Sequence, residues 1–425
     1  EAPELAARTI HRAVEHLPHA MAAYAPHGAY PEGPMYWSYG TSFNVVLIDL
    51  LESVLGTDFG LCGAPGFDKT GEFLSLTTGP SGKTFNFADG GPGRQVEPAL
   101  FWFAGRFQRP DWASHDLALL TASKGEGAGK ASAGEGGRLM PLLLLWLDGA
   151  LGESEARPPA HWSGAGKVPV TLHRSSWNDP NAIFVGLKGG SPQGPHGHMD
   201  IGSFVLDADG RRWAVDLGAE GYHAIEARGM NLWGRDQDAD RWKIFRQTSL
   251  SHNTLVIDGQ AQRVTGSGEF VRFSDNPKLP HSVLEMTSVY AGQLSGAWRG
   301  IALLPSGRLL IRDRLTGLKP GAIVRWGMVT LGTPKEAGAT VTLSQGDASL
   351  DLTAALPSAV TWQTYETATP PAEYDSPNPG TIMVGFEATA PADGTLDLAI
   401  LVTPGSLSER PAETFDTATD PLSWS

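Results

Sequence analysis

Hydrophobic positions recur with helical spacing in the first part of the chain. The segments with this pattern are 4–22, 42–55, 96–107, 112–121 and 139–151. Pro18 lies inside the first segment and predicts a kink or a break there, and Gly56 predicts the end of the second. The intervening segments 25–35, 57–94 and 125–137 have the composition of loops, and the last, rich in Gly, Ala and Ser, is expected to be mobile.

From about residue 158 the pattern changes to short apolar runs separated by turn residues. The predicted strands are 168–172, 182–187, 202–206, 212–216, 254–257, 298–304, 308–313, 324–331, 341–344, 349–356, 359–365, 381–386 and 395–402. Regularly spaced strands with turn residues between them indicate stacked antiparallel sheets.

Together the two patterns predict an α+β multidomain fold, in which an α/α toroid is followed by a large antiparallel β-sandwich. We assign 1–157 to the helical toroid, 158–345 to the β-sandwich and 346–425 to a C-terminal continuation of that sandwich. The predicted helices are too few to close a toroid, so the helical part is either a small bundle or a toroid whose N-terminal part is missing from this sequence, and we expect the second.

The composition narrows the class of protein. Hydrophobic residues make up 41% of the chain and charged residues 18%, as in globular proteins. Cys62 is the only cysteine, which excludes an intrachain disulfide and leaves His, Asp and Glu as metal ligands. The net charge of −14 argues against nucleic acid as a partner. The longest apolar run, 139–147, is too short to span a membrane.

Candidate chemistry begins in the segment 194–204, where His196, His198 and Asp200 alternate. On an extended backbone the three side chains would point to one face, as a metal site or a proton-transfer site requires. The neighbouring glycines and proline also fit a surface turn in which the histidines have no special role.

A metal site is suggested by His198, Asp216 and His252, because each lies beside a predicted strand and adjacent strands can bring their ends together. Two imidazoles and one carboxylate suit zinc. The alternative is that Asp216 caps a turn before Gly218 and His252 bonds to a loop carbonyl.

The segments around these residues resemble a known family. The pattern His196-x-His198-x-Asp200-x-Gly202-x-Phe204 is followed by Gly210, Asp216, Gly218 and Tyr222, and then by His252-Asn253-Thr254. Upstream, the segment 28–40 is similar to the segment that carries the catalytic tyrosine of the same family. In this order and spacing the residues resemble the heparinase II/III family of polysaccharide lyases.

The resemblance implies β-elimination at a uronic acid, at a site between the helical part and the sandwich. Tyr36 matches the tyrosine that serves as acid and, in syn elimination, also as base, with Tyr39 as the fallback. His196 matches the catalytic histidine, which acts as base on the opposite face or helps to hold the carboxylate. His198, Asp216 and His252 match the ligands of a structural divalent metal, which we expect to be Zn²⁺.

One family feature has no counterpart here. The Asn or His that neutralises the substrate carboxylate would lie upstream of Glu1, and His11, His16 and His19 are interpreted as ordinary helix residues. For substrate contact we select Tyr222, Asn231, Arg246 and Trp37, with Trp233 as a further ring that could stack on a sugar.

We therefore predict a lyase whose partner is an acidic polysaccharide or oligosaccharide, with glycosaminoglycan preferred and alginate or glucuronan next. A zinc-dependent glycan hydrolase and a non-catalytic carbohydrate-binding protein are the alternatives. We expect a periplasmic or secreted bacterial protein with no visible signal peptide, and a homodimer is compatible with the sequence.

Overall fold

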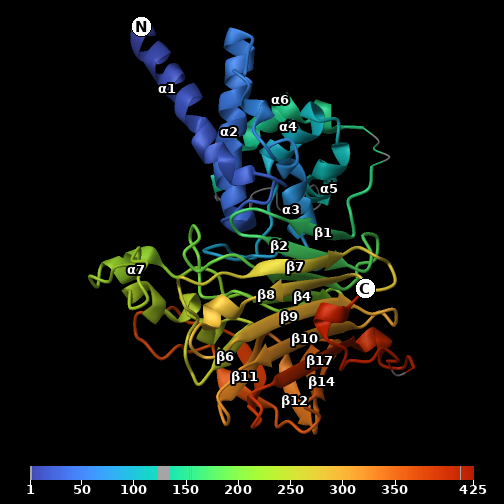
Figure 1. Cartoon of the computed structure of the whole chain (residues 1–425). Coiled ribbons are helices and arrows are strands. Elements are labelled where there is room, and N and C mark those ends of the chain that lie inside the picture. The colour runs from blue at the N-terminus through green and yellow to red at the C-terminus, as the bar shows by residue number, and fades with distance from the viewer. Residues whose placement is uncertain (1, 123–134, 153, 155, 412) are drawn as a thin grey trace. The chain divides into compact units, whose positions relative to one another are not determined.

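The structure is a computed structural model that describes residues 2–122, 135–152, 154, 156–411 and 413–425 (Figure 1). Most of the predicted mobile loop at 125–137 lies outside the described residues. The chain forms two compact units. The helical unit comprises Glu1–Thr78, Gly93–Pro159 and Gly164–Lys167, and the β unit comprises Gly79–Pro92, Ala160–Ser163 and Val168–Ser425.

The helical unit contains two long helices and several short ones. Its α-helices are α1 (Pro3–Met21), α2 (Gly33–Leu55), α3 (Phe73–Thr77), α4 (Pro98–Arg106), α5 (Ser114–Ala122) and α6 (Leu143–Trp146). α4 is apolar all round and is buried from Pro98 to Ala104, where Phe103 packs against Trp37 and Phe67. Among the described residues, no helix is long and apolar enough to cross a membrane.

Three of the helix predictions differ from the structure. α2 begins at Gly33, because Pro34 fits the first helical turn, so Tyr36 lies on a helix rather than after a loop. α1 continues past Pro18 to Met21 without a break. The segment 139–151 forms short helical turns in place of one helix, with Pro141 inside the first of them.

The β unit contains three sheets. The five-stranded sheet has the order β1 (His161–Gly164), β2 (Val170–Arg174), β3 (Phe184–Lys188), β4 (Phe204–Ala208) and β5 (Arg211–Ala214). The eight-stranded sheet has the order β12 (Thr333–Ala337), β13 (Thr340–Gln345), β14 (Ala348–Leu356), β17 (Leu396–Pro404), β10 (Leu309–Thr316), β9 (Gly296–Leu303), β8 (His281–Glu285) and β7 (Glu269–Ser274). The four-stranded sheet has the order β15 (Gln363–Glu366), β16 (Ile382–Thr389), β11 (Ile323–Thr330) and β6 (Leu255–Ile257).

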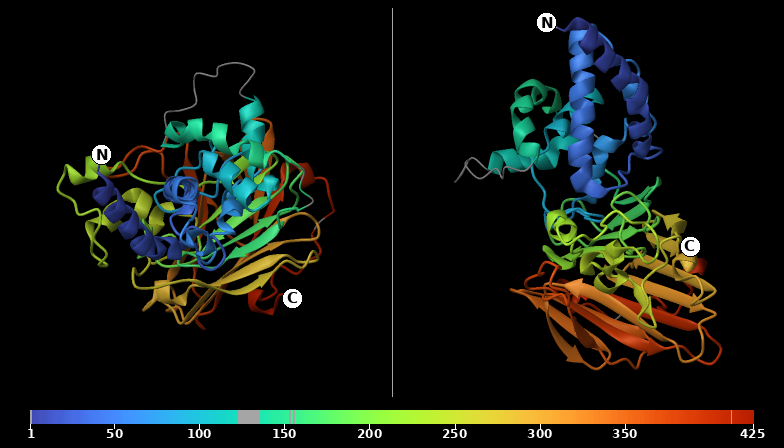
Figure 2. Two further views of the ribbon diagram at one scale, coloured as in Figure 1. Left: turned by 90° about the horizontal axis from the view of Figure 1, so that it is seen from above. Right: turned by 90° about the vertical axis from the view of Figure 1, so that its left-hand side faces the viewer.

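Alternating side chains of the eight-stranded sheet build the core of the β unit. On β10, Leu309 and Ile311 face an apolar cluster that also contains residues of the other two sheets, and Leu310 faces a second cluster together with Trp424. Figure 2 shows the layers of strands that result. The predicted fold class, helices followed by large antiparallel sheets, is confirmed, and the toroid stays a prediction.

A buried histidine makes the stability of the β unit sensitive to acid. His173 on β2 is 1% exposed; its Nε2 lies 2.7 Å from Ser282 Oγ and its Nδ1 lies 3.2 Å from His161 Nδ1. Burial, followed by the nearby His161 and His281, lowers the pKa of His173 well below its usual value. In the folded protein the imidazole therefore stays neutral at pH values where the unfolded chain binds a proton.

We expect His173 to reduce the free energy of unfolding as the pH falls below about 6.5, by about 2 kcal/mol at pH 5. Urea unfolding of the wild type and of His173→Gln at several pH values checks this. The free energy of unfolding should fall less steeply with decreasing pH in the variant than in the wild type. His11→Gln, which removes a histidine from the exposed side of α1, is the control. Equal slopes for wild type and His173→Gln would contradict the prediction.

Candidate functional site

The segment that carries His196 and His198 is a turn before β4, not the extended strand that the alternation predicted. His196 has a φ of +47°, in the left-handed region that non-glycine residues rarely adopt. At Gly197 a side chain would place its Cβ 2.4 Å from the Pro192 carbonyl oxygen, so the turn requires glycine there. Consequently His198 and Asp200 are fully buried, whereas His196 is partly exposed.

His198, Asp200 and His252 form a buried cluster. One ligand atom from each lies within 4.8 Å of the other two, and all three side chains are at most 1% exposed. His198 Nδ1, Asp200 Oδ2 and His252 Nε2 have no hydrogen-bond partner. Because leaving buried polar atoms unpaired is costly, these residues fit a cation, and the nitrogen and oxygen donors suit zinc. We refer to these three residues as the cation cluster.

Each residue of the cation cluster also contacts an acidic or basic side chain through its other nitrogen or oxygen atom. His198 Nε2 lies 2.9 Å from Asp89 Oδ1, His252 Nδ1 lies 2.9 Å from Asp216 Oδ2, and Lys188 Nζ donates to Asp200 Oδ1 at 2.5 Å. A carboxylate bound to the second nitrogen of a ligating imidazole fixes the ring and its tautomer. The arrangement is therefore that of a preorganised metal site.

Both supporting carboxyl groups have pKa values below their usual range. Burial would raise the pKa of Asp89, but His198 and the hydroxyl of Tyr222 bring this pKa below its usual value. In the same way, His252 outweighs burial and lowers the pKa of Asp216. Counting Asp200, three buried acidic side chains thus lie around two imidazoles and Lys188, a set of side chains that suits a bound cation.

The predicted ligand set differs from this cluster in one residue. The structure places Asp216 against His252, as the prediction requires, but it also places Asp200 beside both histidines with an unpaired oxygen. Both carboxylates are candidates for the third ligand, and the assignment of Asp216 stays a prediction.

Two residues lock the strand ends that carry the cluster. Asn253 Nδ2 donates to the carbonyl oxygens of Phe204 and Val215 at 2.7 and 3.0 Å, which ties β6 to β4 and to the end of β5. Arg299 Nη1 donates to the carbonyl oxygens of Gly202 and Asn253, and this guanidinium is itself buried against Asp313.

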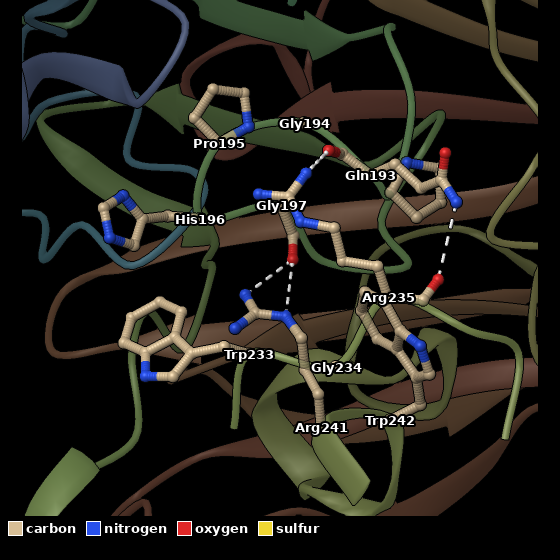
Figure 3. A pocket seen from close by; sticks show the side chains of 11 residues that line it. Gln193, Gly194, Pro195, His196, Gly197, Trp233, Gly234, Arg235, Arg241 and Trp242 are labelled. Atoms are coloured by element: carbon tan, nitrogen blue, oxygen red, sulfur yellow. Dashed lines mark hydrogen bonds between the residues drawn. The ribbon is translucent and has the colours of Figure 1, made fainter. Parts of the chain in front are cut away.

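His196 lines a pocket of about 150 Å³ on the β unit (Figure 3). Trp233, which is 51% exposed, meets the ring of His196 edge to face at 5.8 Å and the ring of Tyr222 at 5.2 Å. Arg241 is buried and donates from Nε and Nη2 to the Gly197 carbonyl oxygen at 3.2 and 2.7 Å, as Figure 3 shows. This guanidinium therefore holds the turn between His196 and His198.

The residues predicted for substrate contact have different surroundings. Tyr222 donates its hydroxyl to Asp89, and Asn231 is exposed, with its Oδ1 accepting from Trp233 N. Arg246 donates to Asn378 Oδ1 and to the carbonyl oxygens of Ala219 and Pro377.

The fourth predicted contact, Trp37, is contradicted by its burial. Its side chain is completely buried in the helical unit, where Nε1 donates to Thr70 Oγ1, so it cannot stack on a sugar ring. Tyr36, one residue earlier on α2, is partly exposed.

Comparison with known proteins places this site in a family. A family model described as heparinase II/III-like, C-terminal, matches residues 177–409. The chain belongs to the heparinase II/III-like family. The matched range includes the cation cluster, His196, Arg241 and Trp233. The predicted resemblance is therefore confirmed.

Solved structures related to this heparinase II/III-like chain share its fold. A heparan sulfate lyase (HepC mutant) from Pedobacter heparinus is 16% identical, with a TM-score of 0.65 over 92% of this chain and 55% of that one. A heparinase III structure is 14% identical, with a TM-score of 0.64 over 93% of this chain and 56% of that one. The chain thus spans about half the length of these proteins. No curated protein matched it.

Three residues that shape the heparinase II/III-like site were not selected from the sequence. Asp89 lies in a segment, Phe85-Asn-Phe-Ala-Asp-Gly90, whose alternating aromatic residues are buried and whose Ala88 has a φ of +54°. That alternation, followed by Asp-Gly, was a usable signal. Lys188 and Arg241 gave none, because one ends an ordinary strand and the other lies among mixed charges.

Proposed function

We propose that the chain is part of a lyase that cleaves a uronic-acid-containing polysaccharide by β-elimination, with glycosaminoglycan as the preferred substrate. The observation that carries the proposal is the position of His196. A partly exposed imidazole is held in an unfavourable backbone conformation beside an exposed tryptophan, on a turn anchored to the cation cluster. Such strain persists where the surrounding structure fixes it, and it concentrates at functional sites.

In the proposed reaction His196 removes the C5 proton of the uronate. The electrons of the C5–H bond form the C4=C5 double bond, and the C4–O4 bond breaks. Tyr36 gives its proton to the departing O4, and in syn elimination the same tyrosine also serves as the base. Alginate or glucuronan would undergo the same steps, since each carries a carboxylate next to the acidic C–H.

We further propose a structural divalent cation, in particular zinc, bound by His198, His252 and a carboxylate from Asp216 or Asp200. When bound, it would fix the strand ends beneath the turn of His196. The burial of all these side chains favours this role over hydrolysis, because a cation that activates water must be open to substrate. The acidic polymer as substrate agrees with a periplasmic or secreted location.

The deciding experiment follows the ultraviolet absorbance of the unsaturated uronate product on hyaluronan, chondroitin, heparan sulfate and alginate. It is best done with the protein including any region upstream of Glu1. An absorbance increase on one of these polymers supports the lyase. Release of reducing ends without that product would show a hydrolase instead, and binding of polymer without any cleavage would show a carbohydrate-binding protein.

Arg241→Met tests how His196 is positioned. Without the two hydrogen bonds to the Gly197 carbonyl oxygen, the turn loses its anchor, and kcat should fall about ten- to a hundredfold with KM nearly unchanged. Cation content should stay the same. Arg228→Met, at an exposed arginine on the α7 side (Tyr222–Glu226), is the matched control. An unchanged kcat in Arg241→Met would show that the hydrogen bonds from Arg241 to Gly197 have no part in catalysis.

A further inference from the structure

A second pocket in the β unit has the chemistry of an anion site. It has a volume of about 230 Å³ and is lined by three cationic side chains, Lys83, Arg212 and Arg246. Asn86, Asn378 and Thr381 add polar groups to its wall. It shares no lining residue with the pocket at His196.

The cations of this pocket are not fully balanced by carboxylates. Arg212 is paired with the buried Asp207, and Asp216 in the wall is already bound to His252 and to Gly218 N. Arg246 donates its hydrogen bonds to carbonyl and amide oxygens, and Asp375, outside the pocket wall, also interacts with it electrostatically. Among the described residues, Lys83 Nζ has no hydrogen bond and no ion pair within 4 Å, although Asp207 acts on it electrostatically from a longer distance. Three of the lining residues are thus basic and Asp216 is the one acidic residue among them, in a protein whose net charge is −14.

Two further features show that the pocket is built rather than incidental. Asn86 is 1% exposed and donates to the carbonyl oxygens of Gly90 and Asp216, which leaves its Oδ1 buried without a partner. Gly218 has a φ of +69° and packs so closely on Gly90 that a Cβ would lie 2.8 Å from the Gly90 carbonyl oxygen. The two loops that carry Asn86 and Asp216 thus hold each other in place.

We propose that the pocket of Lys83, Arg212 and Arg246 binds the acidic group of one sugar residue of the polymer, a carboxylate or a sulfate, at a subsite separate from His196. The inference rests on the proposed function. Its volume is below the roughly 300–1,000 Å³ of pockets for larger ligands, so it suits a single ring or its acidic substituent. Lys83 supplies the ammonium that the anion would pair with, and Asn86 Oδ1 would accept a sugar hydroxyl.

Calorimetric titration with glucuronate, inorganic sulfate and glucose tests the subsite directly. We expect the wild type to bind glucuronate or sulfate at least tenfold more tightly than glucose, and Lys83→Met to weaken that binding about tenfold. The arm that binds, glucuronate or sulfate, identifies the acidic group. Lys335→Met, which removes an exposed lysine on β12, should bind as the wild type does. Thermal unfolding of Lys83→Met should be unchanged, since its ammonium has no partner to lose.

Equal affinity for glucose, absence of binding by either anion, or full binding by Lys83→Met would overturn the subsite. The outcome is independent of catalysis, because Lys83 lines this pocket and not the pocket at His196. Lys83-dependent anion binding without lyase activity would contradict the proposed function and support the anion site. Lyase activity without that anion binding would support the proposed function and contradict the anion site.

Discussion

Replacing His196 by alanine is expected to lower kcat on the uronate polymer by about 10²–10⁴ and to leave the fold and the cation content unchanged. The reason is that His196 lies outside the cation cluster, at the pocket beside Trp233, so its removal takes away proton transfer without exposing a buried ligand. The rate of unsaturated product formation at saturating substrate measures the loss. His223→Ala removes an exposed histidine nearby on α7 and should retain full activity.

The same experiment with Tyr36→Phe tests the other half of the acid–base pair. Phenylalanine keeps the ring on α2 and removes only the hydroxyl, so kcat should fall by about 10²–10⁴ as well. Tyr39→Phe is the matched control, because Tyr39 is 47% exposed on the same helix and was the fallback candidate. If Tyr39→Phe is inactive and Tyr36→Phe is active, the roles of the two tyrosines are exchanged. Full activity in both Tyr36→Phe and His196→Ala would contradict the proposed mechanism.

Most strands were predictable from their apolar residues, and two of the four that were missed are exposed edge strands. All thirteen predicted strands overlap observed ones, because buried central strands contain apolar runs such as Leu309–Ile311 in β10 and Leu398–Val402 in β17. The strands β1, β7, β8 and β12 were missed. β7 and β12 are the two edges of the eight-stranded sheet and are largely exposed, so no apolar run marks them. At such edges tertiary pairing, not local pattern, decides the strand.

The candidate site was predictable in its residue types and less so in its geometry. The positions of His198, Asp216 and His252 beside predicted strands, together with the family resemblance, suggested that they converge, and the structure brings Asp216 to His252. The neighbouring glycines and proline allowed a turn at His196 as the alternative to an extended segment, but the sequence did not show the left-handed backbone of His196. Nor could it reveal Asp89, which reaches His198 from more than a hundred residues away in the chain. Long-range partners of this kind leave no periodic signal.

Loss of the cation should have the largest effect on stability. A cation that binds only the folded protein and is present at a thousand times its Kd adds about 4 kcal/mol to the free energy of unfolding. We expect a chelator to remove this contribution and to lower the unfolding midpoint, and His252→Ala to abolish cation binding measured by elemental analysis. Asp347→Asn, at an exposed ion pair with Arg211, should retain the cation. A protein that contains no cation and is equally stable with and without added zinc would contradict the prediction.

Asp200→Asn and Asp216→Asn then decide which carboxylate is the ligand. Asparagine keeps the shape of each side chain but removes its charge. Replacing the carboxylate that is the ligand should abolish cation binding. Replacing a carboxylate that only orients His252 should weaken cation binding about 10- to 100-fold. Asp200 has the unpaired oxygen, and Asp216 has the contact with His252 Nδ1. If Asp200 is the ligand, Asp200→Asn should lose more cation binding than Asp216→Asn, and if Asp216 is the ligand, the order should be reversed. If neither variant changes zinc affinity in competition with a chelator, neither carboxylate is a ligand, and the three unpaired atoms of the cation cluster would need another explanation.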